Sequence, residues 1–105
     1  MINDQWIEKF QREALPQIIK NLKPKKILLF GSRVTGNATQ DSDLDIILIS
    51  DVFKDIPFVR RMEMVLKIAR FEKHIDYLCY TSEEFEKIKN SSSIIQNALE
   101  CCIEV

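Results

Sequence analysis

Three aspartates stand within the five residues 41–45, which read Asp-Ser-Asp-Leu-Asp. Asp43 and Asp45 are two residues apart at the start of an apolar run, so a β-strand would point both carboxylates to one face. Two such charges about 4 Å apart repel each other by roughly 4 kcal/mol at an effective dielectric constant of about 20. Either one carboxylate is protonated or a divalent cation lies between them. Oxygen ligands at this spacing suit Mg²⁺ or Mn²⁺ better than Zn²⁺.

A third carboxylate, Asp76, interrupts the strand-like run 74–80, which reads His-Ile-Asp-Tyr-Leu-Cys-Tyr. If this strand neighbours the strand with Asp43 and Asp45, Asp76 can reach the same cation or a second one. Three carboxylates around two metal ions form the layout that holds a nucleoside triphosphate. One ion would grip the phosphates, and the other would lower the pKa of an attacking hydroxyl.

Phosphate groups also need hydrogen-bond donors, and the segment around Gly31 and Ser32 offers them. These residues directly follow the apolar run 26–30 and open a short helix. Glycine lets phosphate oxygens approach the backbone, and the Ser32 hydroxyl adds a donor. Two further candidates remain open. Arg33 either adds positive charge or points to solvent, and Ser42 either contacts the nucleotide or braces the aspartates.

Each of these features is weak evidence when taken alone. An Asp-x-Asp pair also occurs in solvated turns and in structural calcium sites, and a single strand aspartate such as Asp76 is uninformative by itself. The joint order favours a metal and phosphate site: a strand, Gly-Ser, a short helix, Asp-Ser-Asp-x-Asp on a second strand, and an aspartate on a third.

The elements that would position these residues follow from the apolar periodicity. Pro16 predicts either a kink or two separate helices within the first helical stretch. The pattern predicts helices over 3–22, 57–72 and 81–89, strands over 26–30, 43–50 and 74–80, a short helix or turn over 32–37, and a last amphipathic segment around 94–102. This order predicts an α+β fold, in which one small mixed β-sheet carries helices and residues 1–105 form a single domain.

The overall composition narrows the function. The 15 Lys and Arg residues are balanced by 16 Asp and Glu, which gives a formal net charge of −1 and no basic face for nucleic acid. No apolar run reaches the roughly 20 residues that span a bilayer, and the first ten residues lack a signal-peptide pattern. We therefore expect a cytoplasmic protein with no membrane contact. The three cysteines show no metal-ligand spacing and are expected to be small buried hydrophobes.

These residues closely resemble the signature of the polymerase-β-like nucleotidyltransferase superfamily. The resemblance rests on Gly31-Ser32-Arg33, Gly36 and the segment 41–45, and it extends to Lys-Pro-Lys-Lys-Ile-Leu-Leu-Phe-Gly-Ser-Arg before them and to the stretch from His74 to Ile88. It is closest to the minimal nucleotidyltransferases, or MNT proteins, of bacteria and archaea. It implies the polymerase-β-like fold and transfer of a nucleoside monophosphate from a triphosphate, with pyrophosphate leaving.

The resemblance also implies roles for individual residues. Asp43, Asp45 and Asp76 would be the catalytic carboxylates that bind Mg²⁺, as two ions, with Mn²⁺ as an alternative. Gly31 and Ser32 would bind the triphosphate.

MNT proteins commonly pair with a helical HEPN-type toxin, and similar members inactivate the toxin by adenylylating a tyrosine. Since 105 residues leave little room for a separate acceptor domain, we expect a partner protein that brings its own acceptor group. The resemblance implies ATP as the nucleotide and a HEPN-type protein as that partner. A homo-oligomer stays open. The alternative is a non-catalytic binding module that neutralises a toxin by contact alone. A free-standing RNA-tailing enzyme fits the net charge least well.

Some other polar and apolar residues have ordinary explanations. His74 shares the strand parity of Asp76 and could accept a proton, but a partly buried strand histidine is the simpler expectation. Arg60, Arg61 and Lys67 could contact phosphates, but exposed helix charges are the simpler expectation. The segment with Ile94, Ile95 and Leu99 either packs in the core or forms an apolar docking face.

Overall fold

The computed structural model describes residues 4–105, and the first residue of the predicted N-terminal helix, Asn3, lies outside this range. In chain order the elements are α1 (Gln5–Glu13), α2 (Leu15–Leu22), β1 (Lys26–Phe30), α3 (Ser32–Thr35), β2 (Leu44–Ile49), the 3-10 helix η1 (Asp51–Asp55), α4 (Phe58–Ile68), β3 (Ile75–Tyr80), α5 (Ser82–Ile88), α6 (Ser93–Glu100) and β4 (Ile103–Glu104).

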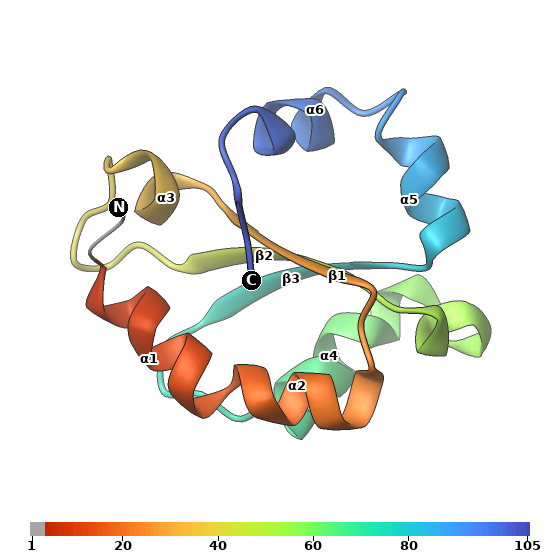
Figure 1. Cartoon of the computed structure of the whole chain (residues 1–105), viewed down its shortest axis with the longest axis horizontal. Coiled ribbons are helices and arrows are strands. Elements are labelled where there is room, and N and C mark those ends of the chain that lie inside the picture. Colours follow the sequence, from red (N-terminus) through yellow and green to blue (C-terminus); the bar gives the residue numbers. More distant parts are fainter. Residues whose placement is uncertain (1–3) are drawn as a thin grey trace.

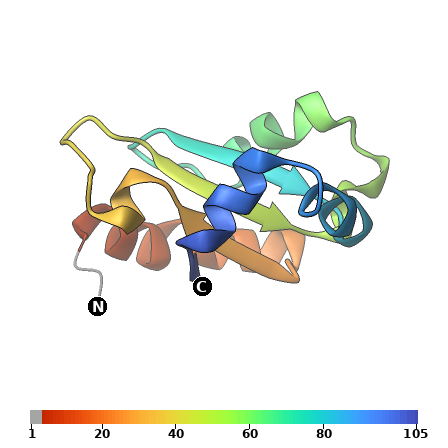
Figure 2. The ribbon, with the colours of Figure 1, turned by 90° about the horizontal axis from the view of Figure 1, so that it is seen from above.

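The four strands form one mixed sheet in the order β3-β2-β1-β4. β1 pairs antiparallel with β2 and with β4, whereas β2 and β3 run parallel and are connected through α4. Helices α1, α2 and α4 cover one face, α5 and α6 lie on the other side, and α3 follows the end of β1 (Figure 1; Figure 2 shows α6 above the strands and α1 and α2 beneath them). The α+β class and the mixed sheet expected from the sequence are therefore confirmed.

The sheet separates two apolar clusters because successive strand residues point to opposite faces. On β2, Leu44, Ile46 and Leu48 face the larger cluster with α1, α2 and α4. Ile47 and Ile49 face the smaller cluster with α5 and α6. Asp45 shares the side of Ile47 and Ile49, at the end of β2 where the smaller cluster stops.

The first helical stretch is two helices, as Pro16 allowed. The carboxylate of Asp4 caps α1 by accepting hydrogen bonds from the backbone N–H groups of Trp6 (2.8 Å) and Ile7 (3.2 Å). Pro16 lies in the first turn of α2, where its missing N–H has no intrahelical partner to lose. The capping box predicted for α5 is also present.

Two parts of the helix and strand prediction were wrong. The predicted helix 57–72 ends at Ile68, because Phe71 belongs to a loop whose ring packs edge-on against Trp6 and Phe10. The apolar periodicity beyond Ile68 arises from tertiary packing of Phe71 and does not indicate a helix. The C-terminal residues also form the unpredicted strand β4, whose register is held by pairing with Leu28 and Leu29 of β1.

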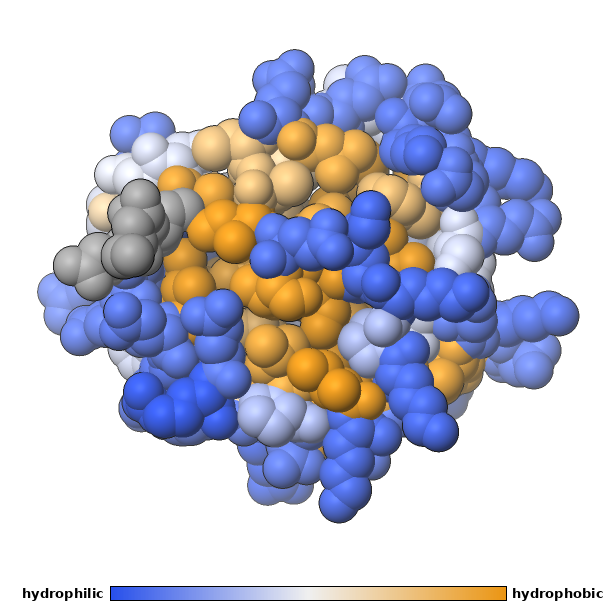
Figure 3. Space-filling model, in the orientation of Figure 1, coloured by the Kyte–Doolittle hydropathy of each residue, from blue (hydrophilic) through white to orange (hydrophobic). Residues whose placement is uncertain are grey.

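Apolar side chains gather at the centre of the face seen in Figure 3, where β4 and the C-terminal end lie in Figure 1. Phe30, Cys102, Ile103 and Val105 are partly exposed there. Because β4 and β3 are opposite edges of the sheet, the part of this apolar surface on β4 is separated from Asp76 by β1 and β2, whereas Phe30 pairs directly with Asp45. Among residues 4–105, no helix combines the length and the apolar character that crossing a lipid bilayer requires.

The C-terminal apolar segment divides between core and surface. Ile95 is buried in the smaller cluster and Leu99 packs against it, whereas Ile94 is 68% exposed. Most of this segment is therefore committed to core packing, and Ile94 alone of the three presents a large apolar surface to solvent.

Arg61 is not the exposed helix charge that we expected. Its side chain is buried, and Nε donates to the carbonyl of Ile56 (2.8 Å) while Nη1 donates to the carbonyl of Cys79 (3.2 Å). The same guanidinium holds both oxygens of Glu84, at 2.6 and 3.1 Å. These hydrogen bonds to Arg61 lower the pKa of Glu84 below its ordinary value. Arg61 thus ties α4 to β3 and to the start of α5.

We expect Arg61→Met to lower the free energy of unfolding by about 2–3 kcal/mol, because two carbonyls lose their donor and Glu84 loses its partner. Arg60→Met is the matched control, since the neighbouring Arg60 is exposed and a change there should stay within about 0.5 kcal/mol. Urea unfolding at pH 7 measures both. Equal effects in the two variants would contradict the assigned role of Arg61.

Candidate active site

The parallel register of β2 and β3 brings the predicted acidic residues together. Asp45 pairs with Asp76, and Leu44 pairs with Ile75. Asp43 and His74 each precede one residue of the Leu44–Ile75 pair. The Leu44 N–H donates a hydrogen bond to the His74 carbonyl (3.4 Å), so the pairing continues to this position. Alternation along each strand puts all four polar side chains on one face. We call Asp43, Asp45, His74 and Asp76 the four-residue grid.

The grid is compact at its outer end. Ligand-type atoms of Asp43, His74 and Asp76 all lie within 4.8 Å of one another. The His74 Nε2 atom is 2.9 Å from Asp76 Oδ1, and the two side chains are about half exposed. The prediction that Asp76 reaches the pair on the neighbouring strand therefore agrees with the geometry. His74 differs from expectation, because a partly buried strand histidine was the simpler interpretation.

Asp45 is a partly buried member of the grid. Burial raises the pKa of Asp45, and the negative charges of Asp76 and Asp43 raise it further, while His74 acts in the opposite direction. The fold therefore supplies too little positive charge around this carboxylate to balance its neighbours. Such an excess of negative charge is what a divalent cation would relieve.

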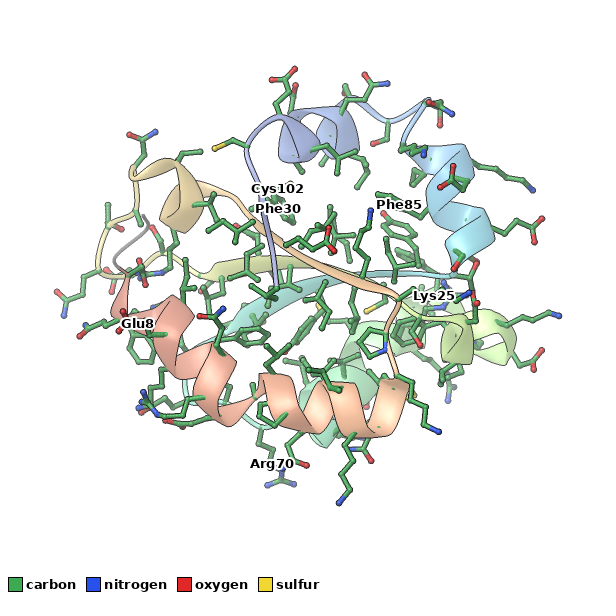
Figure 4. All side chains as sticks on the ribbon, in the orientation of Figure 1. Glu8, Lys25, Phe30, Arg70, Phe85 and Cys102 are labelled. Atoms are coloured by element: carbon green, nitrogen blue, oxygen red, sulfur yellow. The ribbon has the colours of Figure 1, made fainter. Side chains whose placement is uncertain are left out.

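Gly31 lies directly against Asp45. Phe30 pairs with Asp45 across β1 and β2, and the next residue turns the chain into α3. Gly31 has φ 83° and ψ −164°, and a Cβ atom added to it would lie 2.2 Å from Asp45 Oδ2. Both the backbone conformation and the close approach require glycine here. Ser32 follows as the first residue of α3. Phe30 and Cys102 mark the neighbouring apolar surface in Figure 4.

Arg33 holds the loop that leads into β2. Its guanidinium is buried and donates to Ser42 O (2.9 Å), Thr39 O (3.2 Å) and Gln40 O (3.3 Å). Its Nη1 also donates to Asp4 Oδ2 at 2.9 Å. Arg33 therefore does not point to solvent, which was one of the two alternatives for this residue. A phosphate contact would require Arg33 to exchange one of these protein oxygens for the nucleotide.

Ser42 takes part in the same loop. Its Oγ accepts a hydrogen bond from the Thr39 N–H (2.9 Å) and lies 3.3 Å from Thr39 Oγ1. Ser42 therefore braces its own loop at Thr39, and among the described residues no hydrogen bond joins its side chain to an aspartate. A hollow of about 640 Å³ lies between the start of α1 and this loop, from Asp4 to Gln40, and the grid residues do not line it.

The sequence contained a signal for His74 that its simplest interpretation passed over. His-x-Asp at the start of β3 has the same spacing as Asp-x-Asp at the start of β2, so two parallel strands in register place like positions side by side. What the sequence did not provide was the register. Without it, the histidine could have faced either Asp43 or solvent.

The raised pKa of Asp45 predicts a stability that depends on pH. Its ionised form destabilises the metal-free fold, and this penalty is absent below the ordinary aspartate pKa of about 4. We expect Asp45→Asn to raise the free energy of unfolding at pH 7, with the gain disappearing as the pH falls through that range. Urea unfolding in metal-free buffer between pH 3.5 and 8 measures the difference. Asp41→Asn, at an exposed position, is the control, and a destabilised Asp45→Asn at pH 7 would contradict the prediction.

Gly31→Ala and Gly36→Ala separate backbone strain from contact with Asp45. Both glycines have positive φ, but a Cβ at Gly36 meets nothing within 4 Å. We expect each alanine to cost about 1–3 kcal/mol of stability from strain. Only Gly31→Ala should also displace the Asp45 carboxylate and change its pKa, as followed by NMR titration. An unchanged Asp45 titration in Gly31→Ala would show that the contact is not as described.

Comparison with known proteins places this geometry in a family. The family model described as "Nucleotidyltransferase domain" matches residues 11–105. A Methanocaldococcus jannaschii protein named "Putative protein adenylyltransferase" is 31% identical over 96 residues, covering 86% of this chain and 92% of that protein. A crystal structure of a "putative nucleotidyltransferase" from Sulfolobus solfataricus superposes with a TM-score of 0.59 at 24% identity, covering 83% of each chain.

The fold alone is shared more widely than the family. BolA1 from Arabidopsis thaliana superposes with a TM-score of 0.55 at 18% identity, covering 70% of this chain and 92% of that one. The arrangement of strands and helices is therefore not sufficient to identify an activity. The family model and the sequence relative carry that step, and they show that the chain belongs to the nucleotidyltransferase domain family and is a nucleotidyltransferase.

Proposed function

We propose that this nucleotidyltransferase transfers AMP from ATP to a hydroxyl group of a partner protein. The acceptor oxygen forms a bond to the α-phosphorus, the bond from that phosphorus to the bridging oxygen breaks, and pyrophosphate leaves as the hydroxyl proton is released. The observation that carries the proposal is the β2/β3 register, which gathers Asp43, Asp45 and Asp76 beside Gly31. The name of the Methanocaldococcus relative supports a protein acceptor.

The donor set of the grid fits a divalent cation. Three carboxylates converge on one face, and the pKa of Asp45 is raised first by burial and then by the negative charges of Asp76 and Asp43. Asp43, Asp45 and Asp76 would hold Mg²⁺, as two ions. When bound, such ions neutralise charge on the phosphates and favour the ionised form of the acceptor hydroxyl.

The residues around the grid would orient the nucleotide. Gly31 leaves space at the end of β1 where a side chain would collide with Asp45, so the backbone there can lie close to phosphate oxygens. Ser32 would donate its hydroxyl to a phosphate. Arg33 would act mainly by fixing the loop before Asp43, and Ser42 would brace the same loop. Among these residues the first two are the proposed nucleotide contacts.

The acceptor that best fits the chain is a protein that brings its own hydroxyl group. The formal net charge of −1 argues against an RNA acceptor that binds through its phosphates. A HEPN-type toxin, encoded next to this protein, is the partner that we propose, so that the transfer neutralises the toxin. Neutralisation by contact alone is the competing outcome of the experiment below.

The experiment incubates the protein with ATP labelled at the α-phosphate, Mg²⁺ and the product of the adjacent gene. We expect label on the partner protein, and a loss of about 100-fold or more in Asp43→Asn, because one carboxylate of the grid is lost. Asp41→Asn is the matched control, since it removes an equal charge from an exposed position two residues away.

Three readouts decide the outcome. Complex formation between Asp43→Asn and the partner should be unchanged, which separates chemistry from docking. Toxin neutralisation that survives Asp43→Asn would instead favour contact alone. Label that appears on RNA in the absence of any partner would overturn the proposed acceptor class.

A further inference from the structure

His74 occupies the fourth corner of the grid, and the three-carboxylate mechanism assigns it no task. The parallel pairing of β2 and β3 places Asp45 beside Asp76. The same pairing, continued to the residues just before these strands, places His74 beside Asp43. Its Nε2 atom lies 2.9 Å from Asp76 Oδ1, and one of its ring nitrogens lies within 4.8 Å of a carboxylate oxygen of Asp43. Among the described residues, Asp76 supplies the one hydrogen bond recorded for this ring.

Packing does not explain the position of His74. Its side chain is 51% exposed, and the residue lies just before β3, outside both apolar clusters. A histidine that served only the core would turn its ring toward one of those clusters. Here the ring instead turns toward two carboxylates on the same face of the sheet.

We propose that His74, in the tautomer that carries its proton on Nδ1, binds a metal ion through Nε2 in place of the hydrogen bond to Asp76, and that it gives the grid a preference for transition-metal ions over Mg²⁺. Imidazole nitrogen binds the later first-row ions more strongly, and affinity at a nitrogen-containing site rises from Mn²⁺ to Co²⁺. Mg²⁺ prefers oxygen ligands and gains little from a nitrogen. This inference rests on the proposed metal site and deepens it by naming the ion class that the site selects.

The competing explanation is that His74 only positions Asp76 through a hydrogen bond. His74→Gln separates the two roles, because the glutamine amide can still donate to Asp76 Oδ1 but offers no imidazole nitrogen. His74→Phe removes both the hydrogen bond and the nitrogen. Both substitutions are at an exposed position, and thermal unfolding in EDTA checks that each variant folds.

The experiment titrates the metal-free protein with Mg²⁺, Mn²⁺ and Co²⁺ separately, without nucleotide or acceptor. We expect wild-type protein to bind Co²⁺ more tightly than Mg²⁺. His74→Gln should lose about tenfold or more in Co²⁺ affinity while its Mg²⁺ affinity changes by less than about twofold. Electron spin echo spectroscopy of bound Mn²⁺ should detect one coordinated nitrogen in the wild type and none in His74→Gln.

Every result of this titration decides the question. His74→Gln that matches the wild type for all three ions, together with the absence of a nitrogen signal, would overturn the ligand role and leave a positioning role. Wild-type protein that binds none of the ions, or binds Mg²⁺ as tightly as Co²⁺, would also overturn it. Because no ATP is present, these results are independent of the labelling experiment, so failure to label a partner would leave the ligand assignment standing.

Discussion

The site depends on a repulsion that the fold maintains between like charges. The hydrogen-bonded register of β2 and β3 sets Asp45 beside Asp76, and alternation along β2 adds Asp43 to the same face. The strands do not adjust to relieve this crowding, because Ile46, Ile47 and Leu48 are buried on both faces of the sheet and fix the register. Burial and, after it, the charges of Asp76 and Asp43 raise the pKa of Asp45 in this fixed arrangement. Local instability at a site is expected where a ligand, and not the protein, supplies the compensating charge.

Much of the framework could be predicted from the sequence because its signals are local. The strand cores at 26–30, 44–49 and 75–80, the break at Pro16 and the capping box of α5 each follow from patterns within a few residues. The mixed α+β sheet then follows from the order of the elements. The acidic residues and Gly31 could be proposed in advance because their types are costly or conformationally special in a strand context.

The remaining features depend on contacts between residues far apart in the chain. Arg61 looks like any helix arginine until Glu84, 23 residues later, is placed against it. Strand β4 is too short to show a pattern and exists because β1 offers a free edge. Phe71 continues the apolar periodicity of α4 in the sequence, but it is apolar because its ring packs against Trp6 and Phe10. The position of His74 needed the strand register, which composition and periodicity do not give.

The ion pair between Arg33 and Asp4 determines whether residues 31–45 could be transferred to another protein. One carboxylate oxygen of Asp4 accepts a hydrogen bond from the start of α1, and the other accepts one from Arg33. Arg33 in turn donates to the backbone carbonyls ahead of Asp43. Residues 31–45 therefore do not form a self-sufficient cassette. Grafted onto a foreign scaffold without a matching helix cap, they would carry a buried guanidinium with no counter-charge, and the loop would lose the shape that its own amino-terminal helix imposes.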